Sequence, residues 1–326
     1  MRFWPLIKLL PQKTNLRFVR YARALGALSV VAILASLFLS LFPLRPPCGG
    51  LNCGVDFRGG TVLELSTAPR PVDLGQVRGT LGGLGLGDVQ VQQFGAPTDA
   101  LVRFETAQGQ NPAQVVDRVK GALRQSLGPE TRFTRTEVVG PKVSDELFQA
   151  GMLALLVAIG LMLLYIWFRF GLTFGIGAVV ALFHDVILTF GLFALTRMEF
   201  TLTGVAAILT IIGYSMNDTV VVLDRVRENL RKYKRMPVGE VIDLSINETL
   251  SRTIITGVTG IMALTGLAVF GGETLFAFSI AMIFGIVVGT YSSIYVAAPV
   301  LMLLGVRRGE DEPARQPGGA APVPRP

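Results

Sequence analysis

The chain has 326 residues, of which 51% are hydrophobic and 16% are charged, and its mean hydropathy is +0.53. A soluble domain carries about 25% charged residues, so this composition excludes an ordinary soluble protein and favours a chain that lies mostly in a lipid bilayer. The net charge of +7 does not indicate nucleic-acid binding, because the basic residues cluster beside hydrophobic segments, as they do where they set membrane topology.

Six segments are apolar and long enough to cross about 30 Å of hydrocarbon, which takes roughly 20 helical residues. A cleavable signal peptide is the alternative for the first segment, but that run is too long and has no small-residue cleavage site. The predicted order is a cytoplasmic arm (1–23), span one (24–44), an outer domain (45–146), spans two to four (147–168, 171–196, 200–223), a cytoplasmic loop (224–252), spans five and six (253–272, 276–304) and a disordered cytoplasmic tail (305–326).

Lysine and arginine fall on one side of this six-span path. They gather in the arm, at Arg169 between spans two and three, in the loop after span four, and in the tail. The turns on the other side carry only Arg197 with Glu199, and Glu273. Because short cytoplasmic loops carry the excess of basic residues, we expect both termini to be cytoplasmic.

The segment 45–146 has the patterning of a soluble α+β domain. It is predicted to hold a strand in GVDFRGGTVLELS, a helix from Asp73 to about Leu84, strands in DVQVQQF and ALVRFET, a helix from Pro112 to Leu127 and a strand in RFTRTEVV. Asp73 and Asn111 supply helix-start chemistry. The order β-α-β-β-α-β predicts a ferredoxin-like, split-βαβ fold. The domain has no histidine and its acids are scattered, so we expect it to bind or to act as a lever, not to catalyse.

Two cysteines, Cys48 and Cys53, lie in the stretch CGGLNC. They are too few for a disulfide scaffold, and a C-x4-C pair without histidines is a poor zinc site. Two alternatives remain at this point: a small disulfide, if the loop faces an oxidising compartment, or two unpaired structural thiols. The sequence predicts no metal and no cofactor.

The loop between spans four and five contains apolar residues at helical spacing after Pro237. These residues are Val238, Val241, Ile242, Ile246 and Leu250. The pattern predicts an amphipathic helix that lies at the membrane interface, although packing against a partner protein would give the same pattern.

Glycines recur within the predicted spans, among them Gly285 and Gly289. Small residues at such spacing predict close helix packing and no further role. Pro299, near the end of span six, predicts a kink.

Few strongly polar side chains lie within or beside the predicted spans. They are Asn217 and Asp218 in the cytoplasmic half of span four, His184 and Asp185 near the middle of span three, and Arg252 at the mouth of span five. Ionisable side chains are costly in a bilayer and normally face the bundle interior, where they pair or conduct. An aspartate whose arginine partner can move away is a proton switch, because pairing favours the charged acid and a dry site favours the protonated one. We therefore expect Asp218 to bind protons and Arg252 to be its switching partner.

Plainer roles remain for the same residues. Asp218 could instead reach the interface or cap a helix, although its short side chain snorkels poorly. Arg252 could be only a topology anchor. His184 and Asp185 could form a relay, but neighbours in sequence project to different helix faces. We therefore expect one of the two only to hydrogen-bond across helices, and we favour Asp185 for the proton pathway.

Several stretches, taken in order, resemble one protein family. They are LLPQKTNLRFVRYAR, VDFRGGTVLEL, HDVILTFGLFAL, YSMNDTVVVLDRVRENLRK, TLSRTIITG and FGGETLFAFSIAMIFGIVVGTYSSIYVAAPV. With the six-span plan and its single outer domain, they resemble the SecF members of the SecD/SecF family of bacterial protein-export membrane proteins, in the RND superfamily. The resemblance covers roughly residues 5 to 308; CGGLNC and the tail fall outside the pattern.

The resemblance implies a function that periodicity does not give. In that family SecF works with SecD, a second six-span protein, beside the SecYEG channel of the inner membrane, and proton flow moves outer domains that draw unfolded exported chains across. The family's intramembrane acid matches Asp218, its arginine matches Arg252, and its histidine–aspartate pair matches His184 and Asp185. Because this chain has one six-span half, the resemblance implies a SecD-like partner.

Three other classes compete with this hypothesis. An intramembrane aspartyl protease would use Asp185 and Asp218, but the glycine–aspartate signature and H-E-x-x-H are missing, so we expect no enzyme. A small-molecule RND exporter half would need a second outer repeat to form a drug pocket. A structural scaffold for a SecD-like partner, without its own ion pathway, would tolerate alanine at Asp218 and Arg252.

Overall fold

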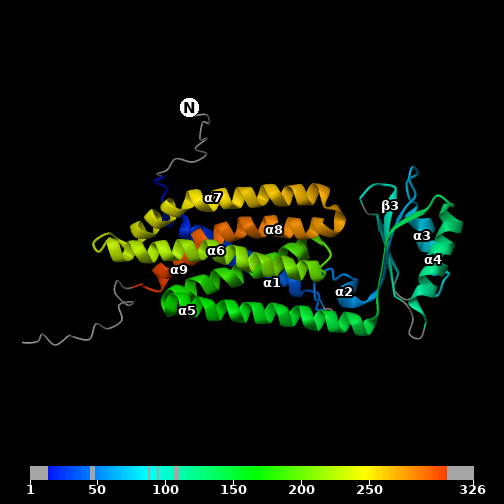
Figure 1. Cartoon of the computed structure of the whole chain (residues 1–326), viewed down its shortest axis with the longest axis horizontal. Helices are drawn as coiled ribbons and strands as arrows, with labels where there is room; N and C mark the ends of the chain where they lie inside the picture. Colours follow the sequence, from blue (N-terminus) through cyan, green and yellow to red (C-terminus); the bar gives the residue numbers. More distant parts are fainter. Residues whose placement is uncertain (1–13, 45–47, 87–88, 94, 106–109, 307–326) are drawn as a thin grey trace, which may run out of the picture.

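The computed structural model of the chain describes residues 14–44, 48–86, 89–93, 95–105 and 110–306. Five helices in these ranges are long and apolar enough to cross a membrane. They form a bundle, and a small sheet with two helices lies beyond one end of it (Figure 1). The first described residues and the last helix lie at the opposite end (Figure 1). Most of the predicted arm, and all but the first two residues of the predicted disordered tail, lie outside the described residues.

The outer domain lies between α1 and α5, and from α5 onward the membrane helices follow one another with short connections. Their bounds are α1 Ala22–Leu41, which follows the short turn η1 Val19–Tyr21, α5 Pro141–Thr196, α6 Leu202–Lys232, α7 Val238–Phe270, α8 Gly272–Ser292, the π-helical turn η2 Ser293–Ala297 and α9 Ala298–Leu303. The wide π-helical turn ends at Ala297, two residues before Pro299, whose ring removes the backbone donor that an α-helix would need at this point.

Helix α5 is 56 residues long but is divided at Gly171, whose backbone angles are φ +71° and ψ −172°. Only glycine adopts this conformation readily, so the helix cannot run straight through it. A Cβ atom on Gly175, in the second half, would lie 3.4 Å from Ile166 Cγ2 in the first half. The two halves therefore pack against each other near this turn.

The outer domain is an antiparallel sheet with two helices on one face (Figure 1). Its elements are β1 Gly60–Ser66, α3 Leu74–Gly82, β2 Val89–Gln93, β3 Asp99–Phe104, α4 Pro112–Leu127 and β4 Arg132–Val139, and the strand order is β2-β3-β1-β4. The predicted caps are confirmed, since Asp73 accepts from the backbone of α3 and Asn111 from that of α4. Leu63, Val102, Phe104 and other apolar residues form a core between sheet and helices.

The first predicted strand is wrong at its start. Residues Val55–Arg58 form one helical turn, α2, and β1 begins only at Gly60. Gly59 and Gly60 have φ values of +72° and +103°, which break the extended backbone between the two elements. Val55 and Phe57 are both buried.

The predicted interfacial helix and span five are one continuous helix, α7. Val241, Ile242 and Ile246 are buried in the chain's own core, so the prediction that this apolar face lies on lipid is wrong. Asn229 on α6 donates to Ser245 Oγ at 3.0 Å, which ties the two helices together here. The apolar pattern therefore reflects packing within this chain.

Close helix packing is confirmed at Gly285 and Gly289, but the same prediction for Gly171 and Gly213 is wrong, since a Cβ on either would meet no atom within 4 Å. A Cβ on Gly285 would lie 2.4 Å from Ile211 Cγ1, and one on Gly289 would lie 2.9 Å from Ser215 Cβ. Both distances are shorter than real Cβ contacts, so α8 and α6 can approach this closely only because these residues are glycine. This contact brings Ser215 and the end of α8 beside α5.

Candidate functional site

Two carboxylates lie inside the helical bundle, and each is held by hydroxyl groups. Asp185, on the second half of α5, is 2% exposed. Its Oδ1 lies 2.8 Å from His184 Nδ1. Its Oδ2 accepts hydrogen bonds from Ser292 Oγ at 2.9 Å and from Ser215 Oγ. Asp185 is therefore enclosed by groups from α5, α6 and α8.

Asp218, on α6, is only partly buried. Thr253 on α7 donates to its Oδ1, and Ser293 in η2 donates to its Oδ2 at 2.9 Å. The partners of this carboxylate thus come from two other helical elements. Any movement of α7 or η2 relative to α6 changes what holds the Asp218 carboxylate.

The consecutive serines Ser292 and Ser293 each contact a different acid, at the point where α8 widens into the π-helical turn. Each hydroxyl also lies within hydrogen-bond distance of a backbone carbonyl, Gly289 O at 3.1 Å and Thr290 O at 3.0 Å. A hydroxyl has one proton to donate, so carbonyl and carboxylate compete for it. This serine pair links the two acid sites through the backbone.

Sequence reasoning missed Ser215, Ser292, Ser293 and Thr253. The signal in the sequence was the stretch TYSSIY within an otherwise apolar span and the serine that precedes MND. Hydroxyl residues are frequent in membrane helices, where they bond to their own backbone or across to a neighbour. The presence of several hydroxyl residues in a span therefore does not by itself indicate a functional site.

The prediction that the side chains of His184 and Asp185 project to different helix faces is wrong. The side chains were expected to project apart, but His184 Nδ1 contacts Asp185 Oδ1 directly, because the imidazole ring is long enough to fold back toward its neighbour. The ring also stacks on Tyr291, with centroids 5.9 Å apart. The Tyr291 hydroxyl donates to Leu25 O at 2.7 Å and lies 2.9 Å from Ser29 Oγ. The ring is therefore held between α5, α8 and α1.

Arg252 and Asn217 lie outside this interior cluster. Both are exposed, and within the described residues Arg252 forms no ion pair with Asp218. Arg252 directly precedes Thr253, the residue that does contact Asp218. The structure thus brings together Asp185 with His184, and Asp218 with Thr253 and Ser293, and leaves Arg252 and Asn217 on the surface of this chain.

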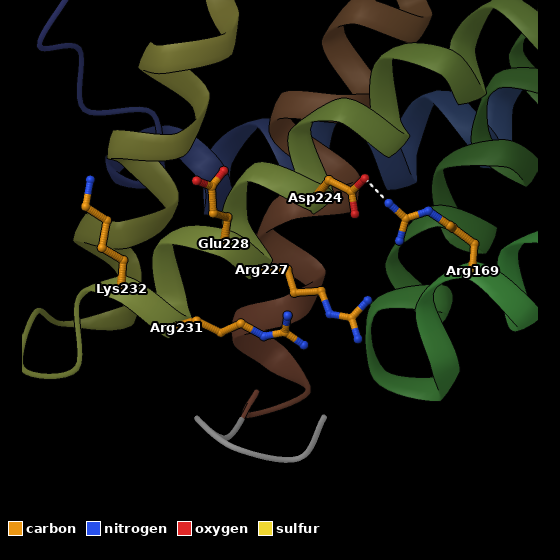
Figure 2. A pocket seen from close by; sticks show the side chains of 6 residues that line it. All are labelled: Arg169, Asp224, Arg227, Glu228, Arg231 and Lys232. Carbon is orange, nitrogen blue, oxygen red and sulfur yellow. Dashed lines mark hydrogen bonds and ion pairs between the residues drawn. The ribbon is translucent and has the colours of Figure 1, made fainter. Parts of the chain in front are cut away.

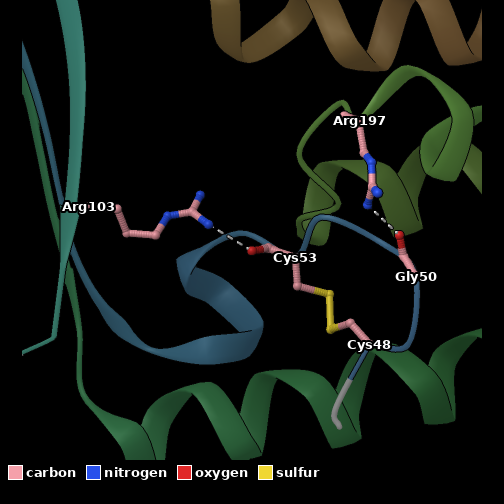
Figure 3. The surroundings of a disulfide bond; sticks show 5 residues. All are labelled: Cys48, Gly50, Cys53, Arg103 and Arg197. Atoms are coloured by element: carbon pink, nitrogen blue, oxygen red, sulfur yellow. Dashed lines mark hydrogen bonds between the residues drawn. A yellow bond between two sulfur atoms is a disulfide. The ribbon is translucent and has the colours of Figure 1, made fainter. Parts of the chain in front are cut away.

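A compact joint ties the outer domain to the bundle (Figure 3). Of the two alternatives for the cysteines, the structure contains the disulfide between Cys48 and Cys53. Arg103 on β3 donates to Cys53 O at 3.0 Å and pairs with Glu199 in the turn between α5 and α6. From the same turn Arg197 donates to Gly50 O at 3.1 Å (Figure 3).

The same joint reaches the first residue of α6. Asp56 Oδ2 accepts from Leu202 N at 2.9 Å, and Cys53 forms a parallel bridge with Phe200. At 1.5 Å per residue, Asp218 lies about 24 Å further along the same helix. The outer domain is thus connected to the Asp218 site by one continuous helix.

The other end of α6 carries a charged pocket of about 480 Å³ (Figure 2). Arg169, at the turn within α5, pairs with Asp224. The remaining lining residues are Arg227, Glu228, Arg231 and Lys232. These charges follow the apolar part of α6 and favour a position at the membrane boundary. Within the described residues, no three histidine, cysteine or acidic side chains gather as metal ligands would.

Sequence comparisons identify one family. Residues 119–307 match the family model for the C-terminal part of the protein export membrane proteins SecD/SecF, and residues 50–69 match the SecD/SecF GG motif. The protein translocase subunit SecF of Rickettsia rickettsii is 41% identical over 309 residues, which cover 94% of this chain and 97% of that protein. The subunit SecF of Rhodobacter capsulatus is 42% identical over 320 residues, with 94% of each chain covered.

Solved structures give the same result. The crystal structure of SecDF, a translocon-associated membrane protein from Thermus thermophilus, superimposes with a TM-score of 0.76 and 33% identity over 93% of this chain. SecDF in a super-membrane-facing form gives a TM-score of 0.64 and 32% identity. This chain spans only 40% of the length of each of those proteins.

Proposed function

Because the chain belongs to the SecD/SecF family of protein export membrane proteins, we propose that it is a proton-coupled accessory subunit of the bacterial Sec protein translocase. It works with a SecD-like six-span partner in the inner membrane, with both termini cytoplasmic. Together they use the protonmotive force to promote the export of unfolded polypeptides through SecYEG. The 40% coverage of the SecDF chains supports the need for a partner that supplies the remaining part.

The observation that carries this proposal is the carboxylate of Asp218 inside an apolar helix, held by hydroxyls from two other elements. Donors on Thr253 and Ser293 favour the charged carboxylate, and their withdrawal in a dry site favours the protonated acid. Opening and closing of these contacts would therefore bind and release one proton. The cost of an acid in a bilayer is the reason to expect such a role.

Arg252 supplies the switching partner. It is the neighbour of Thr253 on α7, and consecutive helical residues differ by about 100° around the axis. A rotation of α7 by that amount would exchange the Thr253 hydroxyl for the Arg252 guanidinium at Asp218. In the present arrangement Arg252 and Asn217 are exposed on the chain, and we propose that the SecD-like partner covers them.

Two finer features of the fold belong to the same proposal. The division of α5 at Gly171 supports six spans, because a 56-residue helix would be about 84 Å long without it, and a bilayer core is about 30 Å thick. The antiparallel strand order β2-β3-β1-β4, with β3 between β1 and β2, supports a ferredoxin-like outer domain. The joint at Arg103, Glu199 and Asp56 would transmit movement between that domain and α6.

The test is Asp218→Asn, which keeps the shape of the side chain and removes its titration. In vesicles that hold the complete complex, we expect Asp218→Asn to lose proton flux and the protonmotive stimulation of export. Glu228→Gln, an exposed acid on the same helix, is the matched control. Repeating the assay in sodium-free buffer separates proton from sodium-ion coupling. Normal flux and export in Asp218→Asn would overturn the proposal.

The alternative is a scaffold for the partner, without its own ion pathway. The absence of an ion pair between Asp218 and Arg252 in the described residues favours it. A scaffold predicts that alanine at both positions leaves export intact as long as the complex assembles. Co-purification of the partner, measured beside export, separates the two functions.

A further inference from the structure

A groove of about 790 Å³ lies between α1 and the rest of the bundle. Its other wall comes from the second half of α5, η2 and α9. Val30 on one wall is 56% exposed and Val180 on the other is 39% exposed, so the groove opens on the surface of the bundle, where lipid lies. The residues of η1 and α1 that line it recur every three or four positions, which places them on one helix face. They include Arg20, Arg23, Gly26, Val30 and Ile33.

The groove begins where the close contact between α1 and α5 ends. A Cβ on Gly191 of α5 would collide with Ser36 of α1, so the two helices touch at this level. A Cβ on Gly26, nearer the start of α1, would meet no atom within 4 Å. The helices therefore enclose open space along the first part of α1.

The groove is charged at one end and mostly apolar along the rest of its length. Arg20 and Arg23 lie at the start of α1, and neither forms an ion pair within the described residues. Ser29 and His184 also line the groove. The Ser29 hydroxyl is bonded to that of Tyr291, and Nε2 of His184 is buried. Neither residue makes the deeper part of the groove hydrophilic.

We propose that this groove binds one anionic phospholipid, with the phosphate at Arg20 and Arg23 and an acyl chain along the apolar part. Arginine donors match phosphate oxygens, and basic pockets between membrane helices recognise anionic head groups. The rise along α1 from Arg23 to Ile33 is about 15 Å, which equals one leaflet of a hydrocarbon core about 30 Å thick. A soluble phosphate would use only the charged end.

A helix of the SecD-like partner is the other candidate occupant. That partner is proposed to cover Asn217 and Arg252, which lie on α6 and α7, whereas the groove is lined by η1, α1, α5, η2 and α9. The two arginines at one end favour an anion, which every anionic phospholipid carries. The inference goes beyond the proposed function, because a lipid can bind here whether or not the chain couples protons.

Native mass spectrometry of the complete complex, loaded with phosphatidylglycerol or with phosphatidylcholine of the same acyl chains, tests the charged end. We expect Arg20→Gln/Arg23→Gln to weaken the binding of one phosphatidylglycerol by about thirtyfold, roughly fivefold for each arginine, and to leave phosphatidylcholine binding unchanged. Lys234→Gln/Arg235→Gln is the matched control, since it removes two exposed charges from the loop between α6 and α7. Equal phosphatidylglycerol binding by the two double variants would overturn the proposal.

Filling the groove tests the apolar part. Gly26→Trp projects into the open space, and Ala27→Trp is the matched control, because Ala27 is the exposed neighbour that does not line the groove. We expect Gly26→Trp to lose the same phosphatidylglycerol and Ala27→Trp to keep it, while both complexes assemble. Undiminished phosphatidylglycerol binding by Gly26→Trp would contradict the inference. Loss of the partner from Gly26→Trp, with no change in lipid binding, would show that a partner helix fills the groove and would also overturn it.

Discussion

The two intramembrane acids of this chain differ in how completely they are enclosed. Asp185 is 2% exposed and is held by His184, Ser215 and Ser292. Asp218 is partly exposed and is held by two hydroxyls. A carboxylate held by three buried groups is a fixed part of the bundle, since removing it leaves buried polar groups without a partner. Asp218 has fewer hydrogen-bond partners and lies near the exposed Arg252, so its carboxylate is free to exchange those partners.

The largest expected difference between the two sites is in stability. Asp185→Ala should lower the free energy of unfolding by roughly 1–3 kcal/mol, because it leaves the buried His184 Nδ1 and Ser215 Oγ without their partner. Asp218→Ala should cost less, about 0.6 kcal/mol as an average for a hydrogen-bonded side chain in a membrane bundle. Thermal unfolding of the purified protein in detergent measures both, and a larger loss for Asp218→Ala would reverse the comparison.

Substitutions of Ser292 and Ser293 should have smaller effects on stability, and they test whether the Asp185 and Asp218 sites act separately. Ser292→Ala and Ser293→Ala should each cost about 0.6 kcal/mol, with an upper value near 1.7 kcal/mol. Ser292→Ala should act mainly on the thermal midpoint, because it removes a donor from the enclosed site. Ser293→Ala should act mainly on proton flux, because it removes one of the two donors to Asp218. Identical effects on midpoint and flux from the two variants would mean that the sites are not distinct.

Arg252 should have the smallest effect on stability. Arg252 is exposed and forms no ion pair in the described part of the chain, so Arg252→Ala should change the free energy of unfolding by less than about 0.5 kcal/mol. Export should nevertheless fall if the guanidinium replaces Thr253 at Asp218 during the cycle. Arg252→Lys is the conservative control and keeps the charge. Full export by Arg252→Ala would show that Arg252 has no role in the mechanism.

Some of these features follow from local sequence chemistry and others do not. The caps at Asp73 and Asn111 depend on residues within three positions of the cap, and the glycine contacts of α8 depend on the smallest side chain; both were predictable. The contact of Asp218 with Ser293 joins residues 75 positions apart, and a serine carries no signal of its partner. Helix α7 misled the prediction because an apolar face looks the same whether it meets lipid or α6.

The central claim is that Asp218 is the group that binds and releases the proton, while Asp185 stays fixed. Infrared difference spectroscopy of the complex across a pH change detects the protonated carboxyl band directly. The account predicts that this band is lost in Asp218→Asn and kept in Asp185→Asn. A band that persists in Asp218→Asn and disappears in Asp185→Asn would contradict the account and identify Asp185 as the proton-binding group.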